Sequence, residues 1–264
     1  MEQPFESDPT PRQRYFIHLA YNGTNYCGWQ TQPDGLPTVQ LTIEHALSTL
    51  LRQPIGIVGC GRTDSGVHAS DFYAHFDHKL FPETKPIDCQ QLAFKMNSFL
   101  PEDIAIFDIR PVHADAHARF DATARTYQYH LSNRRLPFKQ GFYDRIFFVP
   151  DLDKMNEAAK VLMEYEDFTS FAKLHTDVKT NICHLSEAHW DAVGDEWVFT
   201  IRSNRFLRNM VRSVTGTLLD VGRGKLSIDG LRAIVEKKDR CAAGVSMPAC
   251  GLFLTKIEYD YISD

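Results

Sequence analysis

The order of apolar segments restricts the possible fold more than any other feature of this sequence, because one series of segments occurs twice. In the first half, apolar runs predict strands, and apolar residues at helical spacing predict helices. The order is β-α-β-β-α-β, with strands expected at 15–20, 55–60, 67–76 and 104–109 and helices expected to begin at about Val39 and after Asp88. Thr38 and Asp88 are suitable N-caps, because their side-chain oxygens can accept a hydrogen bond from the first turn.

The second half repeats the series and ends on a strand. Its expected elements are a strand at 123–131, a helix at 152–164, a hairpin of 182–193 and 196–203, further helices, and a strand at 252–261. We therefore predict an α+β protein with two ferredoxin-like βαββαβ halves, whose antiparallel sheets are covered by helices on one face. The predicted organisation is a disordered lead-in at 1–13, an N-terminal subdomain at 14–112 and a C-terminal subdomain at 113–264.

A short glycine-rich loop between two expected strands is the best candidate for a site of chemistry. It reads GCGRTDSGVHA from Gly59 to Ala69, and it presents Arg62 and Asp64 two residues apart. Glycine permits positive φ angles and the close approach of a ligand, and loops on a strand scaffold commonly carry functional residues. Taken alone, the same pattern also fits a hairpin with a surface ion pair.

Six blocks of sequence, in order along nearly the whole chain, resemble the motifs of the tRNA pseudouridine synthase A family. The glycine-rich loop is similar to the family signature GRTDxGVHA, and YNGTNYCGWQ from Tyr21 is similar to its opening YDGxxYxGWQ. HARFDATARTYQY from His117 resembles the block HARFxAxxRxYxY, and three further blocks begin at Glu166, Phe206 and Gly251. A match of this extent identifies the chain as a member of the family.

Two positions depart from the family pattern. Ser65 stands in the glycine-rich loop where alanine is common, and Met247-Pro248-Ala249-Cys250 replaces a more usual Ala-Pro-Ala. Both are small changes, so they put fine contacts with the substrate in question rather than the reaction.

The resemblance implies a cofactor-independent isomerase that converts uridine to pseudouridine at positions 38–40 of the anticodon stem-loop of tRNA. It also implies two halves with joined sheets and an RNA cleft between them, and a cytoplasmic homodimer in which one tRNA contacts both subunits. Asp64 is the implied catalyst, either as a nucleophile at C1′ or as a base at the ribose. The sequence leaves these two roles open.

Three more residues acquire roles through the resemblance. Arg62 is expected to pair with Asp64, to keep that carboxylate ionised, and to help hold the target uridine out of the base stack. Tyr127 matches a tyrosine whose ring packs on the flipped base, although alternation with Tyr129 alone fits an ordinary core strand. Arg212 matches an active-site arginine of the family.

The distribution of charge indicates where RNA would bind. The net charge of −5 argues against a generally adhesive nucleic-acid binder. Arg205, Arg208 and Arg212, however, follow i, i+3, i+7 spacing, which would place them on one face of a helix. A second basic stretch around Arg125 is interleaved with aromatic residues, a composition that suits RNA with unstacked bases. We predict that Arg205, Arg208 and Arg125 bind RNA; a solvated surface is the alternative.

No pattern for a metal or cofactor is found in the sequence, and none is expected to bind. The six cysteines form no C-x-x-C pair and are expected to be reduced, and His113 and His117 lack the rest of a zinc-protease motif. The sequence Gly59-Cys60-Gly61 does not open a dinucleotide-binding turn. The longest apolar runs are too short to cross a membrane. Two alternatives stay open: a catalytically silent tRNA-binding protein on the same scaffold, and an unrelated hydrolase that uses Asp64.

Overall fold

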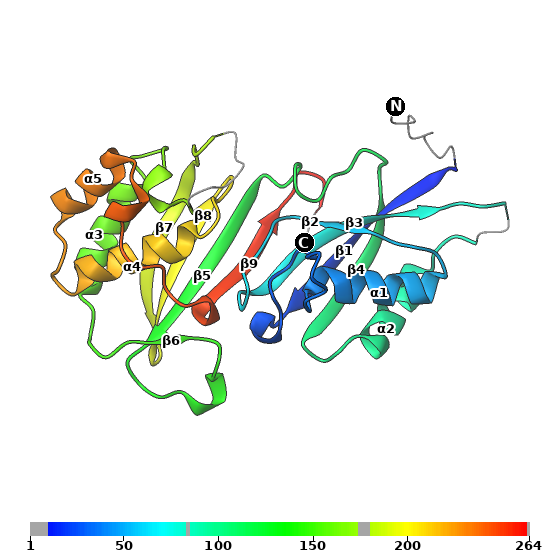
Figure 1. Ribbon diagram of the computed structural model, residues 1–264, viewed down its shortest axis with the longest axis horizontal. Helices are drawn as coiled ribbons and strands as arrows, with labels where there is room; N and C mark the ends of the chain where they lie inside the picture. The colour runs from blue at the N-terminus through cyan, green and yellow to red at the C-terminus, as the bar shows by residue number, and fades with distance from the viewer. Residues whose placement is uncertain (1–9, 83–84, 174–179, 263–264) are drawn as a thin grey trace.

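A single nine-stranded sheet runs through the molecule (Figure 1). The computed structural model describes residues 10–82, 85–173 and 180–262. The main path of the sheet has the strand order β4-β1-β3-β9-β5-β8-β7, with β2 paired to β3 and β6 paired to β5. The mixed α+β class with a mostly antiparallel sheet is therefore confirmed.

The first half of the sheet is built from the first series of elements. These are β1 (Arg12–Tyr21), α1 (Val39–Leu51), β2 (Ile57–Gly59), β3 (His68–Lys79), α2 (Cys89–Phe99) and β4 (Ile104–Val112). The strands pair antiparallel in the order β4-β1-β3-β2. Thr38 and Asp88 cap α1 and α2 by accepting hydrogen bonds from the backbone of the first turn, as predicted.

The second half repeats this arrangement. Its elements are β5 (Ala124–Ser132), β6 (Asp144–Arg145), α3 (Leu152–Leu162), β7 (Leu185–Val193), β8 (Glu196–Ser203), α4 (Met210–Gly222), α5 (Ile228–Lys237) and β9 (Leu252–Glu258). The four long strands pair antiparallel in the order β9-β5-β8-β7. The predicted hairpin of β7 and β8 is present, and Gly194 in its turn has a φ of 60°.

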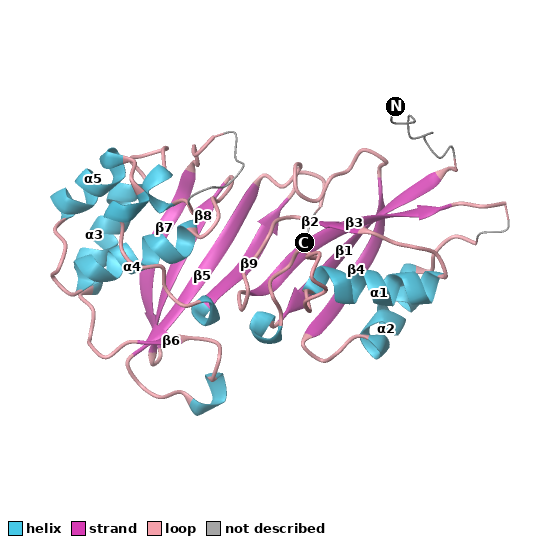
Figure 2. Ribbon diagram, in the orientation of Figure 1, coloured by secondary structure: helices cyan, strands magenta, loops and turns pink. Residues whose placement is uncertain are grey.

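Short 3-10 helices lie in the connections, namely η1 (Gly23–Asn25), η2 (Pro137–Lys139), η3 (Thr169–Phe171), η4 (Arg240–Ala242) and η5 (Ala249–Gly251). Figure 2 shows α1 and α2 beside one end of the sheet and α3, α4 and α5 grouped at the other. Two clusters of buried apolar side chains correspond to these ends. Residues from beyond 113, including Ala116, Ala118 and Tyr259, belong to the first cluster, so the end of the chain returns to the first half.

The two halves meet through β3 and β9, which pair in parallel over His68 and Ala69. The seam therefore differs from the antiparallel pairing of the long strands within each half. His68 is buried at this seam, where its Nδ1 accepts a hydrogen bond from the backbone N–H of Gly23 at 3.1 Å. Its Nε2 lies 3.1 Å from the carbonyl oxygen of Gly141. Burial lowers the pKa of His68, so the neutral ring can use both nitrogens to hold the start of β3 in place.

Two sequence predictions are wrong at the level of secondary structure. Arg205 and Arg208 do not lie on a helix, because α4 begins only at Met210. The preceding Asn209 has a φ of 67°, a left-handed conformation that interrupts any helix coming from its N-terminal side. The lead-in also ends earlier than predicted, since β1 begins at Arg12; residues 1–9 lie outside the described residues.

Candidate active site

The glycine-rich loop connects β2 to β3 and is held in place by contacts with buried side chains. The side chain of Trp29 packs against Gly59, where a Cβ atom would lie 2.6 Å from the indole. Gly66 has a φ of 78°, in the region that favours glycine. Thr63 is buried, and its hydroxyl lies 2.8 Å from the hydroxyl of Tyr21. The loop is thus fixed on both sides of Asp64.

Ser65, one of the two departures from the family pattern, has a structural contact. Its hydroxyl donates to the carbonyl oxygen of Tyr26 at 3.1 Å, and this ties the loop to the segment after β1. The backbone N–H of Val67 donates to the carbonyl of Asp64 at 3.1 Å and closes the turn. The hydroxyl that serine adds relative to alanine therefore has a hydrogen-bond acceptor in the backbone.

Two arginines from the second half of the chain face the carboxylate of Asp64. Nε of Arg208 lies 3.4 Å from Oδ1, and Nη1 of Arg212 lies 3.5 Å from Oδ2. The Asp64 side chain is 26% exposed, against 21% for Arg212 and 57% for Arg208. Each carboxylate oxygen therefore has its own cation, one half-buried and one largely in solvent.

Arg62 is not the ion-pair partner that the sequence suggested. Its side chain is exposed, and the described residues include no ion pair between Arg62 and Asp64. Neighbours along a tight turn need not face one another, and the cations that do face Asp64 come from a segment more than 140 positions later.

Arg212 is anchored by the segment that contains the second departure. Its Nε donates to the carbonyl oxygen of Met247 at 2.5 Å, and the N–H of Met247 donates to the carbonyl of Arg212 at 3.1 Å. This segment can cross α4 closely because Gly216 has no side chain; a Cβ there would lie 1.9 Å from the carbonyl oxygen of Val245. Backbone groups hold Arg212, so a methionine at 247 does not disturb it.

Tyr127 lies in the middle of β5, where it pairs with Ile201 of β8 and Leu254 of β9. Its half-buried ring meets the ring of Phe206 edge-on, with centroids 5.0 Å apart. Burial, the thiol of Cys60 and the carboxylate of Asp64 raise the pKa of Tyr127, so its hydroxyl stays protonated. Phe206 was not among the predicted site residues, although it begins the sequence block that contains Arg208 and Arg212.

Arg125 is occupied by the backbone of the protein. Nη1 donates to the carbonyls of Ala122 and Asn204 at 2.8 and 2.9 Å. Nη2 donates to the carbonyls of Arg119 and Cys60 at 2.7 and 3.1 Å. Since each terminal nitrogen has two N–H bonds, these four contacts use all of them, and the predicted contact with RNA stays untested.

No group of three or more histidine, cysteine or acidic side chains in the described ranges is arranged to hold a metal ion. His117, which the sequence offered as half of an i, i+4 pair, uses Nδ1 to accept from the backbone N–H groups of Arg119 and Phe120. Among the helices of the described chain, none combines the length and apolar character needed to cross a bilayer.

The fold and the site define a class of protein with a two-half sheet and a loop carboxylate that faces arginines, and comparison with known proteins shows which family the sequence resembles. A family model described as tRNA pseudouridine synthase matches residues 158–260. A protein of Bacteroides thetaiotaomicron named tRNA pseudouridine synthase A is 55% identical over 250 residues, which cover 94% of this chain and 91% of the relative. Proteins of the same name from Parabacteroides distasonis and Bacillus pumilus are 55% and 38% identical, covering 94% and 92% of this chain and 96% and 97% of the relatives.

The chain therefore belongs to the tRNA pseudouridine synthase family, as the six sequence blocks predicted, and members of this family are isomerases.

Proposed function

We propose that this protein isomerises uridine to pseudouridine in tRNA and that Asp64 is its catalytic residue. One observation carries the proposal. In a chain of this family, Asp64 lies on a firmly held loop, and its two carboxylate oxygens face the guanidinium groups of Arg208 and Arg212. The names of the relatives support the substrate and the reaction. A site that must handle RNA also needs cations near the reacting group, and this site has them.

The reaction exchanges one glycosidic bond for another. The bond between N1 of uracil and C1′ of the ribose breaks, the base rotates, and a bond between C5 and C1′ forms; the proton on C5 is lost and N1 gains one. Atoms and electrons balance within the nucleotide, so the chemistry calls for no cofactor. A carboxylate can assist either by attacking C1′ or by removing a ribose proton, and both roles stay open for Asp64.

The two arginines at Asp64 suit different tasks. Arg212 is fixed by Met247 and half-buried, so we assign it to holding Asp64 and the target nucleotide in the reactive arrangement. Arg208 is 57% exposed, so it can leave Oδ1 and pair with a phosphate when RNA arrives. Tyr127, protonated and half-buried, would pack on the flipped base and assist transfer of the C5 proton.

Further parts of the proposal follow the family resemblance alone. The target would be uridines 38–40 of the anticodon stem-loop, and Arg62 would help to keep the flipped base out of the stack, because a stacked base cannot reach the carboxylate. A homodimer that shares one tRNA and a cytoplasmic location stay predictions, as does the division into subdomains at 14–112 and 113–264.

One assay tests the proposed function. Unmodified tRNA is incubated with the protein in the absence of added cofactor, and pseudouridine is detected by mass spectrometry after carbodiimide labelling. Pseudouridine at the anticodon stem supports the proposal. Bound but unchanged tRNA would indicate the catalytically silent binding protein, and the absence of any interaction with tRNA would return the hydrolase alternative.

A further inference from the structure

One guanidinium group joins two distant segments of the chain and one nearby loop beside the candidate active site. The carbonyl groups that Arg125 binds belong to Arg119, to Cys60 in the glycine-rich loop, and to Asn204 before α4, in addition to the nearby Ala122. The two distant segments and the nearby segment of Arg119 each contain a further arginine at or within two positions of the bound carbonyl. These are Arg119 itself, Arg62 and Arg205.

The three arginines gathered in this way have no acidic partner in the described part of the chain. Arg62 and Arg119 are exposed and Arg205 is half-buried. Burial and the positive charges of Arg62, Arg125 and Arg205 lower the pKa of Arg119, which nevertheless stays charged at neutral pH. Cations held together in this way repel one another, and a bound anion would relieve that repulsion.

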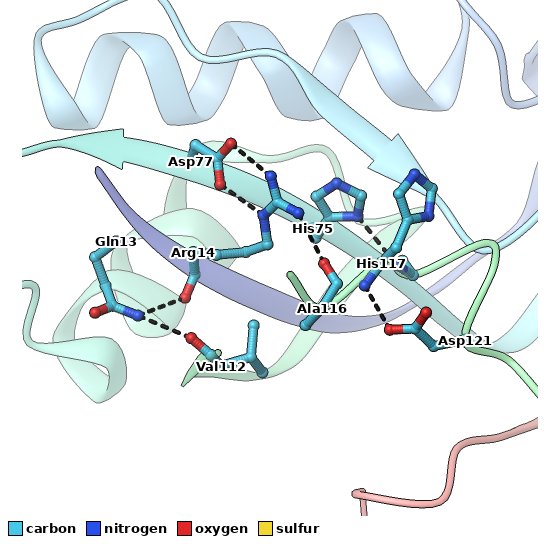
Figure 3. A network of polar contacts seen from close by, with 9 residues as sticks. Gln13, Arg14, His75, Asp77, Val112, Ala116, His117 and Asp121 are labelled. Atoms are coloured by element: carbon cyan, nitrogen blue, oxygen red, sulfur yellow. Dashed lines mark hydrogen bonds and ion pairs between the residues drawn. The ribbon is translucent and has the colours of Figure 1, made fainter. Parts of the chain in front are cut away.

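The loop that presents Arg119 is fixed by a network of polar contacts on the sheet (Figure 3). Nε and Nη2 of Arg14 bind the two carboxylate oxygens of Asp77 at 2.7 and 2.8 Å, and Nη1 donates to the carbonyl of Ala116 at 2.9 Å. Nδ1 of His75 accepts from the N–H of Ala118 at 3.1 Å. Because these contacts fix the backbone, Arg119 is presented in advance rather than ordered by its ligand.

An aromatic side chain stands beside the cluster. Phe120 is 74% exposed, and the guanidinium of Arg119 lies 5.7 Å from the centre of its ring. The ring of His117 stacks on the ring of Phe120, at a centroid distance of 4.2 Å. A cation next to an exposed aromatic ring is a combination that suits RNA with an unstacked base.

We propose that Arg119 and Arg205 form a binding site for a backbone phosphate of RNA near the target nucleotide, and that Arg125 is the positioning residue that assembles it. The inference rests on the proposed function for the identity of the anion as RNA. Guanidinium groups suit this ligand because their planar N–H pairs match phosphate oxygens. The site adjoins Asp64, because Arg62 is two residues from it and Arg205 is three residues from Arg208.

Binding of unmodified tRNA at several salt concentrations tests the phosphate site, in an Asp64→Asn background so that the RNA is not converted. Arg119→Ala should raise Kd roughly tenfold and reduce the magnitude of the salt slope by about 0.7–0.9, the value for one lost phosphate contact. Arg232→Ala is the matched control: it also removes one positive charge, but Arg232 is paired with Glu164 at the far end of the second half. Slopes for Arg119→Ala and Arg205→Ala equal to that of the control would overturn the site.

Arg125→Lys tests the positioning role. Lysine keeps the charge, but its three N–H bonds cannot bind four carbonyl groups, so the salt slope should fall as it does for Arg119→Ala. A wild-type slope in folded Arg125→Lys would overturn the positioning role. The pseudouridine assay on the wild-type protein tests the proposed function separately from the phosphate site. If no pseudouridine forms, the proposed function is wrong, and the salt slopes still decide whether the arginine cluster binds a polyanion.

Discussion

The two halves of the chain contribute to the site in opposite ways. The first half supplies a single carboxylate on a loop that is tied down by a buried tyrosine, a buried tryptophan and the seam between β3 and β9. The second half supplies cations whose anchoring varies, from Arg212, bound to Met247, to Arg208, which is largely in solvent. The carboxylate of Asp64 is therefore held in place on a fixed loop, whereas one of the two cations that face it, Arg208, has room to adjust its position.

The largest effect should follow from removing the rigid group. Asp64→Asn keeps the size of the side chain but removes the nucleophile or base, so we expect pseudouridine formation to fall by at least about a thousandfold. The affinity for tRNA should stay within a few fold of the wild type. Single-turnover assays and filter binding measure the two quantities. Turnover near the wild-type rate would show that Asp64 takes no part in the chemistry, and the contrast between a fixed reacting group and adjustable cations would then be wrong.

The next largest effect should separate the two arginines that face Asp64. Arg212→Ala should lower the rate at saturating tRNA by about a hundredfold, because an anchored cation beside the carboxylate acts in the transition state. Arg208→Ala should mainly weaken tRNA binding and lower the magnitude of the salt slope by about 0.7–0.9. Steady-state kinetics at several salt concentrations distinguish the two. If both variants change only binding, the difference in anchoring has no catalytic meaning.

A pH titration probes the polar network of Arg14, Asp77 and His75 in the first half of the chain. Burial and the positive charge of Arg14 lower the pKa of His75 to about 4, below its ordinary value of 6.5. Between these values the unfolded chain binds the proton and the folded protein does not, so stability is present above pH 6.5 and falls as the pH drops towards 4. We expect a loss of roughly 3 kcal/mol in the free energy of unfolding, measured by urea denaturation. His75→Gln should flatten this part of the profile; an unchanged profile would remove His75 as its source.

The smallest effect concerns the rigidity of the glycine-rich loop. Gly66→Ala forces a side chain into a left-handed conformation and should cost about 1 kcal/mol of stability. Gly61→Ala is the control in the same loop, since Gly61 has no positive φ and a Cβ there would meet nothing within 4 Å. Thermal unfolding compares the two variants. Equal melting temperatures would mean that the loop is less rigid than its contacts indicate.

The extent of successful sequence prediction differs between fold and site. Caps and apolar periodicity are local, so α1 and α2 and the hairpin of β7 and β8 were predicted correctly. The helix expected through Arg205 and Arg208 was wrong, because spacing alone does not reveal that Asn209 adopts a left-handed conformation. The family blocks drew attention to Asp64 and Arg212, whose roles stay predictions, but the ion pair expected between Arg62 and Asp64 is replaced by pairs from another part of the chain.

The sequence by itself determined the series of elements and the family, and it singled out Asp64 as the candidate catalytic residue. Only the tertiary structure decided which charges meet. The partners of Asp64 come from beyond residue 200, and the carbonyls bound by Arg125 come from segments up to 79 residues away. Such contacts depend on the parallel pairing of β3 with β9 and on close packing at Gly216, which no local pattern of residues specifies. Local preferences act within one turn or one strand, whereas a charged site is assembled by the folding of the whole chain.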